Sequence, residues 1–182
     1  MPTLWTRILS AAANAVFPPR CRACGAFFPP PEKRRAASGP PKGDEPPADV
    51  FVRAFSALLC GRCLQGYIPV RGPVCRRCGL MVAGRPEDDH FCADCLEGPA
   101  LFSRARAAGV CDGVLLALLH RFKYDGCTEL ARPLAGLLLA AFQRYFGDAA
   151  IDAVVPVPLH AGRLRSRGFN QAELLARSTA AV

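Results

Sequence analysis

Four pairs of cysteines, each with the spacing Cys-x-x-Cys, constrain the fold of this chain more than any other feature. They account for eight of the ten cysteines and lie at Cys21/Cys24, Cys60/Cys63, Cys75/Cys78 and Cys92/Cys95. Two thiolates from one tight turn can reach the same ion, and two such turns complete a tetrahedral shell of four sulfurs. The spacing therefore predicts two metal sites in the first half of the chain.

We pair the cysteines in the order of the sequence, because the 13 residues between Cys78 and Cys92 are close to the spacing of known zinc sites. The first site then comprises Cys21, Cys24, Cys60 and Cys63, and the second comprises Cys75, Cys78, Cys92 and Cys95. An interleaved arrangement of the pairs is the alternative. Closed four-sulfur shells leave no coordination position for a substrate, so we expect both sites to be structural.

Zinc is the metal that we expect at both sites, two ions in all. The alternative of disulfides needs an oxidising compartment, but the N-terminus lacks the basic start of a secretion signal. Iron–sulfur clusters are a second alternative, and the paired spacing favours zinc over them. His90 is predicted to be an exposed loop residue rather than a ligand. Cys111 and Cys127 are predicted to be small buried residues.

The formal net charge of +8 is weak evidence for nucleic-acid binding. Two zinc ions, each held by four thiolates, would reduce it to +4. The longest apolar run, from Leu134 to Phe142, is about half of the roughly 20 residues that a bilayer helix needs. We therefore expect a cytoplasmic protein without a membrane span.

Composition predicts two domains, 1–98 and 99–182. The first contains the cysteine pairs, a short N-terminal amphipathic helix within residues 1–17, and a flexible insertion at about 29–49 that is dense in Pro, Gly and charge. The residue pattern of the second predicts that it is an α/β domain. Its predicted strands are 103–110 and 151–155, and its predicted helices are 114–122, 128 to about 146, and 170 to about 181. The last helix runs to the end of the chain, so we expect this α/β domain to be incomplete.

A basic loop follows the second predicted strand. It extends from Pro156 through Gly168 and carries Arg163, Arg165 and Arg167 before the last helix. Open α/β sheets bind ligands at the carboxyl ends of their strands, and helix N-termini favour anions. The loop therefore predicts a phosphate or pyrophosphate site, with a solvated basic surface as the alternative.

Four motifs are spread over nearly the whole chain. They are Phe17-Pro18-Pro19-Arg20-Cys21, the four cysteine pairs, Phe122-Lys123-Tyr124, and the run from Pro156-Val157-Pro158-Leu159-His160 to Arg167-Gly168-Phe169-Asn170-Gln171. Together they resemble the ComF family of late-competence, amidophosphoribosyltransferase-like proteins. The resemblance implies an N-terminal double zinc ribbon followed by a type I phosphoribosyltransferase fold. It also implies a role in natural transformation, in the uptake and handling of single-stranded DNA.

The resemblance further implies a substrate site and partners. The substrate would be phosphoribosyl pyrophosphate (PRPP) with Mg²⁺, bound where a complete phosphoribosyltransferase domain exists. Its pyrophosphate would contact Leu159, His160, Ala161, Gly162 and Arg163, with Arg165 and Arg167 in the same loop and Lys123 near the cleft. The implied partners are single-stranded DNA and competence helicase or recombination-loading proteins.

One departure from the family pattern bears on catalysis. No adjacent acidic pair followed by a Thr- and Gly-rich turn occurs after residue 95, and the neighbouring acids Asp88 and Asp89 lie between zinc knuckles. Such a turn cradles the 5′-phosphate with its backbone N–H groups, so PRPP would be held at one end only. We therefore expect no phosphoribosyl transfer and assign no catalytic residue. A zinc-ribbon module that binds single-stranded DNA or competence proteins without catalysis is the alternative function.

Overall fold

The computed structural model describes residues 18–28, 45–84, 90–99, 101–147 and 149–180. The helices are α2 (Pro47–Phe55), α3 (Gly61–Gln65), α4 (Ala93–Glu97), α5 (Gly113–Tyr124), the 3₁₀ turn η1 (Thr128–Leu130), α6 (Ala131–Phe146), α7 (Ala161–Arg167) and α8 (Gln171–Ala180). Within the described residues, β pairing is limited to two isolated bridges, Arg20–Phe27 and Val74–Met81. No helix of the described chain is both long enough and apolar enough to cross a bilayer.

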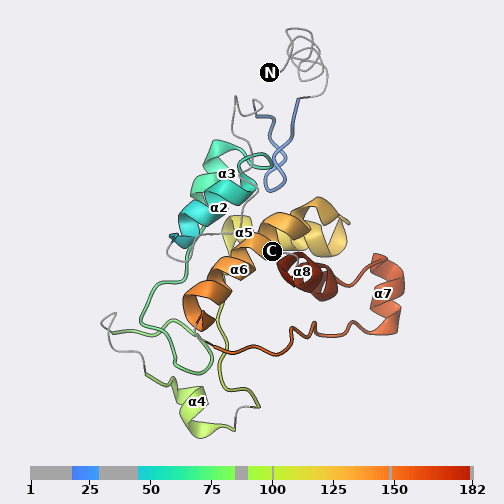
Figure 1. Cartoon of the computed structure of the whole chain (residues 1–182). Helices are drawn as coiled ribbons and strands as arrows, with labels where there is room; N and C mark the ends of the chain where they lie inside the picture. Colours follow the sequence, from blue (N-terminus) through green and yellow to red (C-terminus); the bar gives the residue numbers. More distant parts are fainter. Residues whose placement is uncertain (1–17, 29–44, 85–89, 100, 148, 181–182) are drawn as a thin grey trace.

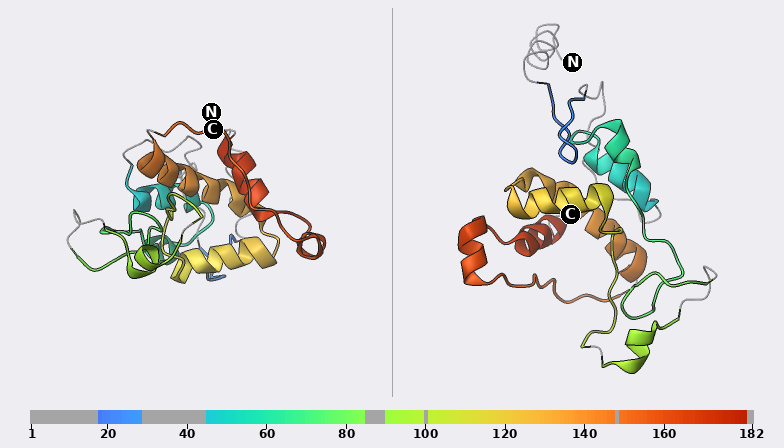
Figure 2. Two further views of the ribbon diagram at one scale, coloured as in Figure 1. Left: turned by 90° about the horizontal axis from the view of Figure 1, so that it is seen from below. Right: turned by 180° about the vertical axis from the view of Figure 1, so that it is seen from behind.

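The hydrophobic core lies between α2, α5, α6 and α8. Phe51 and Phe55 of α2, and Leu118 and Phe122 of α5, are at most 1% exposed. Each pair is four residues apart, which places its members on one face of the helix. Helix α6 packs against both α2 and α8 and runs through the middle of the molecule (Figures 1 and 2). Each large apolar side chain buried in this way contributes about 1.5–3 kcal/mol.

The three helices predicted after residue 110 are confirmed. Asp112 caps α5, because its Oδ1 accepts a hydrogen bond from the first N–H of the helix at 2.7 Å. Asn170 caps α8 by accepting from the N–H of Ala172 at 3.0 Å. These caps satisfy backbone donors that have no partner inside the helix. The helix predicted from Thr128 starts as η1 and continues as α6 to Phe146.

Both predicted strands are wrong for the described structure. Residues 104–107 and 151–160 form no regular secondary structure. A strand needs a neighbour that takes up its backbone hydrogen bonds in a continuous ladder. Among the described residues, 103–110 make only separate backbone bonds to other segments, from Ala105 to Arg77 and from Val110 to Ile68, and 151–155 form no bridge. Ile151, Val154 and Val155 are accordingly 50%, 59% and 82% exposed. The described chain is helical, and it contains no sheet of the predicted α/β domain.

The basic loop predicted from Pro156 to Gly168 is partly helical. Helix α7 occupies seven of its residues and ends at Gly168, whose φ is 77° and whose N–H donates to the carbonyl of Leu164 at 2.8 Å. This left-handed helix ending favours glycine. The prediction was wrong here because seven residues are too few to show a helical period.

The predicted N-terminal helix and residues 29–44 of the predicted insertion lie outside the described residues. The end of that insertion is ordered. Helix α2 begins at Pro47, a favourable first helical residue, and the Arg53 guanidinium donates to both carboxylate oxygens of Glu45 at 2.9 and 2.7 Å. The predicted domain boundary at residue 98 stays a prediction, although residues on both sides of it share one core.

Candidate metal centres

The eight paired cysteines form two clusters, which we call ribbon I and ribbon II. Ribbon I contains Cys21, Cys24, Cys60 and Cys63, and ribbon II contains Cys75, Cys78, Cys92 and Cys95. Within each cluster all four Sγ atoms lie within 4.8 Å of one another. The pairing in sequence order is therefore confirmed, and the interleaved alternative is excluded.

The sulfur separations fit zinc and exclude disulfides between the pairs. The Sγ atoms of Cys24 and Cys60 are 3.8 Å apart, and those of Cys78 and Cys92 are 3.7 Å apart. A tetrahedral ion with bonds of about 2.3 Å to sulfur separates its ligands by about 3.8 Å. A disulfide would bring them to about 2.0 Å, and all these cysteines are free. Each donor set thus fits one structural zinc ion with a closed shell.

The first two cysteines of each ribbon lie in a hairpin turn of the same design. In ribbon II the N–H of Cys75 donates to the carbonyl of Leu80 at 2.7 Å, and the N–H of Gly79 donates back to the carbonyl of Cys75 at 3.0 Å. Gly25 and Gly79 have φ values of 75° and 74°. Such left-handed turns favour glycine, which explains why glycine follows the second cysteine in both hairpins.

The other two cysteines of each ribbon lie on a short helix. Cys60 precedes α3 and Cys92 precedes α4, with nearly identical backbone angles of −70° and 160° or 163°. Cys63 and Cys95 follow within the first turn, so each helix places two sulfurs on the side that faces the hairpin. Each ribbon is therefore a hairpin and a helical turn that close around one ion.

The ionisation of the clusters also favours a cation. Burial opposes ionisation of Cys21 and Cys75, but hydrogen bonds from backbone N–H groups outweigh it and lower their pKa values to about 6 and about 5. Burial raises the pKa of Cys63, together with the hydrogen bonds that its thiol donates to neighbouring sulfurs and the repulsion from the nearby thiolate; the same causes raise the pKa of Cys95 to about 12. One thiolate forms readily in each cluster and opposes the others. A bound Zn²⁺ relieves this repulsion.

The two ribbons differ in how they are attached to the rest of the molecule. Cys21 of ribbon I is part of the hydrophobic core, and Cys60 and Cys63 pack against that core. Ribbon II contributes no residue to this core and lies at one end of the molecule with α4 (Figures 1 and 2). Its contacts with residues 104–106 are polar: the N–H of Ala105 donates to the carbonyl of Arg77 at 2.7 Å, and Arg106 donates to several backbone carbonyls.

The cysteines and histidine predicted to lie outside the metal sites do so. His90 is exposed and belongs to neither four-sulfur cluster. Cys127 is half-buried, and Cys111 is exposed, so the prediction that Cys111 is buried is wrong. Cys111 lies directly before Asp112, the cap of α5, and is not part of the described hydrophobic core.

The residues predicted to bind pyrophosphate are distributed over α7 and the end of α5. His160 caps α7, because its Nδ1 accepts from the N–H of Gly162 at 3.2 Å. Leu159 is half-buried, whereas Ala161, Arg163 and Arg165 are exposed. The assignment of a pyrophosphate site to this segment stays a prediction.

Gln171 links the side chain of Arg167 to the backbone of Lys123. The Arg167 guanidinium lies 4.8 Å from the ring centre of Tyr124 and donates to Gln171 Oε1 at 3.2 Å. Gln171 Nε2 in turn donates to the carbonyl of Lys123 at 3.5 Å. Gln171 therefore links the last residue of α7 to the C-terminal end of α5.

Sequence reasoning missed the role of Arg104 and Arg106. These residues occur in the segment that the alternation of arginine and alanine assigned to a strand. In the structure they contact the backbone of ribbon II and of α6. Their position directly after the last cysteine pair was the available signal, since a charged segment at that position can pack against the ribbon.

Comparison with known proteins supports the ribbon architecture. The double zinc ribbon domain family matches residues 52–96, which include three of the four cysteine pairs, and the structure adds Cys21 and Cys24 to them. No solved structure shows significant similarity to the chain.

Several curated proteins are similar in sequence. The DNA utilization protein YhgH of Salmonella typhi is 34% identical over 125 residues, which cover 67% of this chain and 53% of that protein. Competence protein ComFC of Bacillus subtilis is 29% identical over 140 residues, 70% of this chain and 56% of that protein. Competence protein F of Haemophilus influenzae is 31% identical over 108 residues, 58% and 46% respectively. The chain thus spans about half the length of the curated relatives that it matches. The double zinc ribbon and these relatives show that this chain belongs to the ComF family.

Proposed function

We propose that this chain serves natural competence by handling the single-stranded DNA that enters the cell. The observation that carries the proposal is the similarity to proteins named for competence and DNA utilization. The two ribbons contribute a scaffold rather than a catalyst, because a closed four-sulfur shell has no open position for a substrate. Single-stranded DNA and the helicase or recombination-loading proteins of the competence machinery are the proposed partners.

Deletion of the gene in a naturally transformable host that encodes it tests this role. We expect transformation frequency to fall and to return on re-expression, while growth stays unchanged. Unchanged transformation in the deletion strain would refute the proposal. A variant with Cys21→Ser and Cys75→Ser should fail to restore transformation, since each ribbon would lose a buried ligand.

Direct contact with DNA is tested separately, on the zinc-loaded chain. Retention of a single-stranded oligonucleotide on a filter should decline as salt rises, because released counterions drive such binding. The chain has one Trp, three Tyr and 11 Phe, and aromatic side chains can add base stacking to the phosphate contacts. Absence of retention at low salt would leave protein partners as the route to DNA.

Binding of Mg²⁺ and PRPP is a second candidate function, supported by the exposed arginines of α7. Arg163 and Arg165 are exposed on α7, and Arg167 lies over Tyr124. Isothermal titration of the chain with Mg²⁺ and PRPP tests it. The variant Arg163→Gln should weaken any binding, whereas Arg177→Gln should not, because Arg177 pairs with Glu173 on α8 at 2.6 Å. Absence of heat with the unaltered chain would refute this candidate.

A further inference from the structure

Arg106 contacts the hairpin of ribbon II by donating hydrogen bonds to its backbone carbonyls. Its Nη1 donates to the carbonyls of Cys75 and Arg76 at 3.4 and 3.2 Å, and its Nη2 donates to that of Arg76 at 3.2 Å. Cys75 is a zinc ligand, so the guanidinium is anchored on the metal-binding turn itself. A positive charge there also offsets the negative charge of four thiolates around one Zn²⁺.

Ala105 fits against the same turn. Its N–H donates to the carbonyl of Arg77 at 2.7 Å, and its own carbonyl lies 2.7 Å from the position that a Cβ on Gly79 would take. The segment therefore fits closely against the hairpin in the shape that the hairpin has when its sulfurs converge. Because a metal site rarely keeps that shape without its ion, we expect the contact to weaken when zinc is lost.

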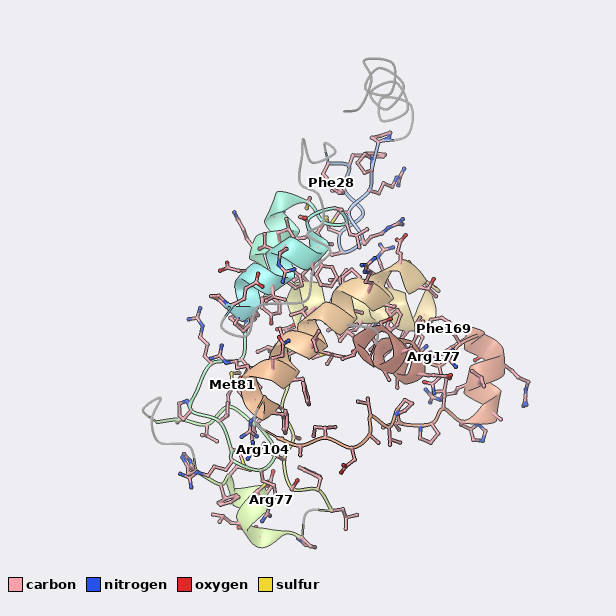
Figure 3. The ribbon with its side chains drawn as sticks, viewed as in Figure 1. Phe28, Arg77, Met81, Arg104, Phe169 and Arg177 are labelled. Atoms are coloured by element: carbon pink, nitrogen blue, oxygen red, sulfur yellow. The ribbon has the colours of Figure 1, made fainter. Side chains whose placement is uncertain are left out.

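The next contact links this segment to the C-terminal end of α6. Arg104 Nη1 donates to the carbonyl of Tyr145 at 3.1 Å. The guanidinium groups of Arg104 and Arg106 lie 5.5 Å from the ring centre of Phe146 and 5.6 Å from that of Tyr145. Figure 3 shows Arg104 between the lower end of α6 and the loops of ribbon II, with Arg77 further out.

This contact supplies what the end of a helix lacks. The last four carbonyls of an α-helix have no partner within the helix, and Tyr145 is the penultimate residue of α6. A cation at this end is also favoured by the helix dipole. Arg104 is therefore an external cap for α6, held in place by the segment that ribbon II holds.

We propose that the zinc of ribbon II stabilises the C-terminal end of α6 through residues 104–106. We call this segment, with its contacts to the hairpin and to α6, the clasp. With the ion bound, the hairpin holds residues 104–106, and these residues hold the last turn of the helix. When the ion leaves, the clasp opens and that turn frays. This coupling acts within the molecule and is independent of any role in competence.

Loss of zinc from ribbon II should not disturb the residues that follow this segment. The Tyr67 hydroxyl donates to the carbonyl of Ala108, and the N–H of Val110 donates to the carbonyl of Ile68 at 2.9 Å. These anchors follow α3 of ribbon I and do not involve ribbon II. Residues 108–124 therefore keep their structure when the clasp opens.

Hydrogen exchange measured by mass spectrometry on the zinc-loaded chain tests the clasp. In Cys95→Ser, zinc content should fall from about two ions per chain to about one. Amide exchange in residues 104–107 and 143–147 should accelerate at least about tenfold, and exchange in residues 114–122 should stay as in the unaltered chain.

A second variant separates the clasp from the metal. Arg104→Gln combined with Arg106→Gln should retain about two zinc ions and still accelerate exchange in residues 143–147. Arg132→Gln is the matched control, because Arg132 is an exposed arginine near the start of the same helix. Unchanged exchange of residues 143–147 in both Cys95→Ser and the double variant would overturn the proposal. Equal acceleration throughout α5 and α6 would also overturn it, since the coupling would then be global.

Discussion

Gly25 and Gly79 adopt the same left-handed backbone conformation in very different surroundings. A Cβ on Gly25 would meet nothing within 4 Å, whereas one on Gly79 would lie 2.7 Å from the backbone carbonyl of Ala105. Backbone cannot move aside as a flexible side chain can. The two positions therefore separate the conformational role of glycine from its role in close packing.

We predict that Gly79→Ala weakens ribbon II more than Gly25→Ala weakens ribbon I. Both variants incur the cost of a left-handed alanine, about 1–2 kcal/mol, and only Gly79→Ala adds a clash with Ala105. Zinc release to a chromophoric chelator measures the effect, and one of the two ions should leave faster in Gly79→Ala. Equal release rates in the two variants would show that the approach of Ala105 does not matter.

The burial of Phe122 likewise depends on residues from other parts of the chain. It is 1% exposed, belongs to the core formed with α2 and α6, and has its ring centre 5.7 Å from that of Phe169. The side chain thus joins α5 to the residue that precedes the cap of α8. Its burial depends on segments that are far apart in the sequence.

At the scale of the element, α5 offers a test of the core. Phe122→Ala should lower the free energy of unfolding by about 3–5 kcal/mol, because it removes a fully buried ring and leaves a cavity. Leu116→Ala on the same helix is the control: Leu116 is 37% exposed, so the loss should be about 0.5 kcal/mol. Urea denaturation followed by circular dichroism measures both. Similar losses in the two variants would contradict the assigned buried face.

The elements also show where sequence patterns are informative. Helix α5 was predictable because its apolar residues recur at helical spacing over twelve residues and Asp112 precedes it. The run Ile151-Asp152-Ala153-Val154-Val155 has the composition of a strand, yet it is unpaired in the described structure. Composition gives a preference for extended backbone, but a strand also needs a neighbour. No local pattern indicates whether that neighbour is there.

At the scale of the whole molecule, ribbon I and ribbon II contribute differently to the stability of the fold. Ribbon I shares the core of α2, α5 and α6, whereas ribbon II is attached through backbone and arginine contacts. We predict that Cys21→Ser lowers the midpoint of thermal unfolding by at least about 10 °C, roughly 3–5 kcal/mol for a domain of this size. Cys95→Ser should lower it by less than about half as much, since the core stays closed. The reverse order would contradict the assigned attachment.

Metal content is the most direct test of the architecture. Elemental analysis of the purified chain should find about two zinc ions per chain, and a strong chelator should reduce the helical circular dichroism signal as ribbon I loses its ion. If the chain holds less than about one zinc ion and no iron, both metal centres are refuted. If it holds iron in place of zinc, the two clusters are iron–sulfur sites. An unchanged melting curve after chelation would show that the fold does not need metal.

The sequence by itself determined the two metal centres, because ligand type and spacing within a short turn are local properties. It also determined three helices, whose apolar periods are equally local. Only the tertiary structure decided that ribbon I joins the core while ribbon II is held by Arg104 and Arg106. It alone brought Arg167 to Tyr124 and left residues 151–155 without a strand partner among the residues that the structure describes. These outcomes depend on which distant segments meet, and the free energy of such contacts is absent from any single stretch of sequence.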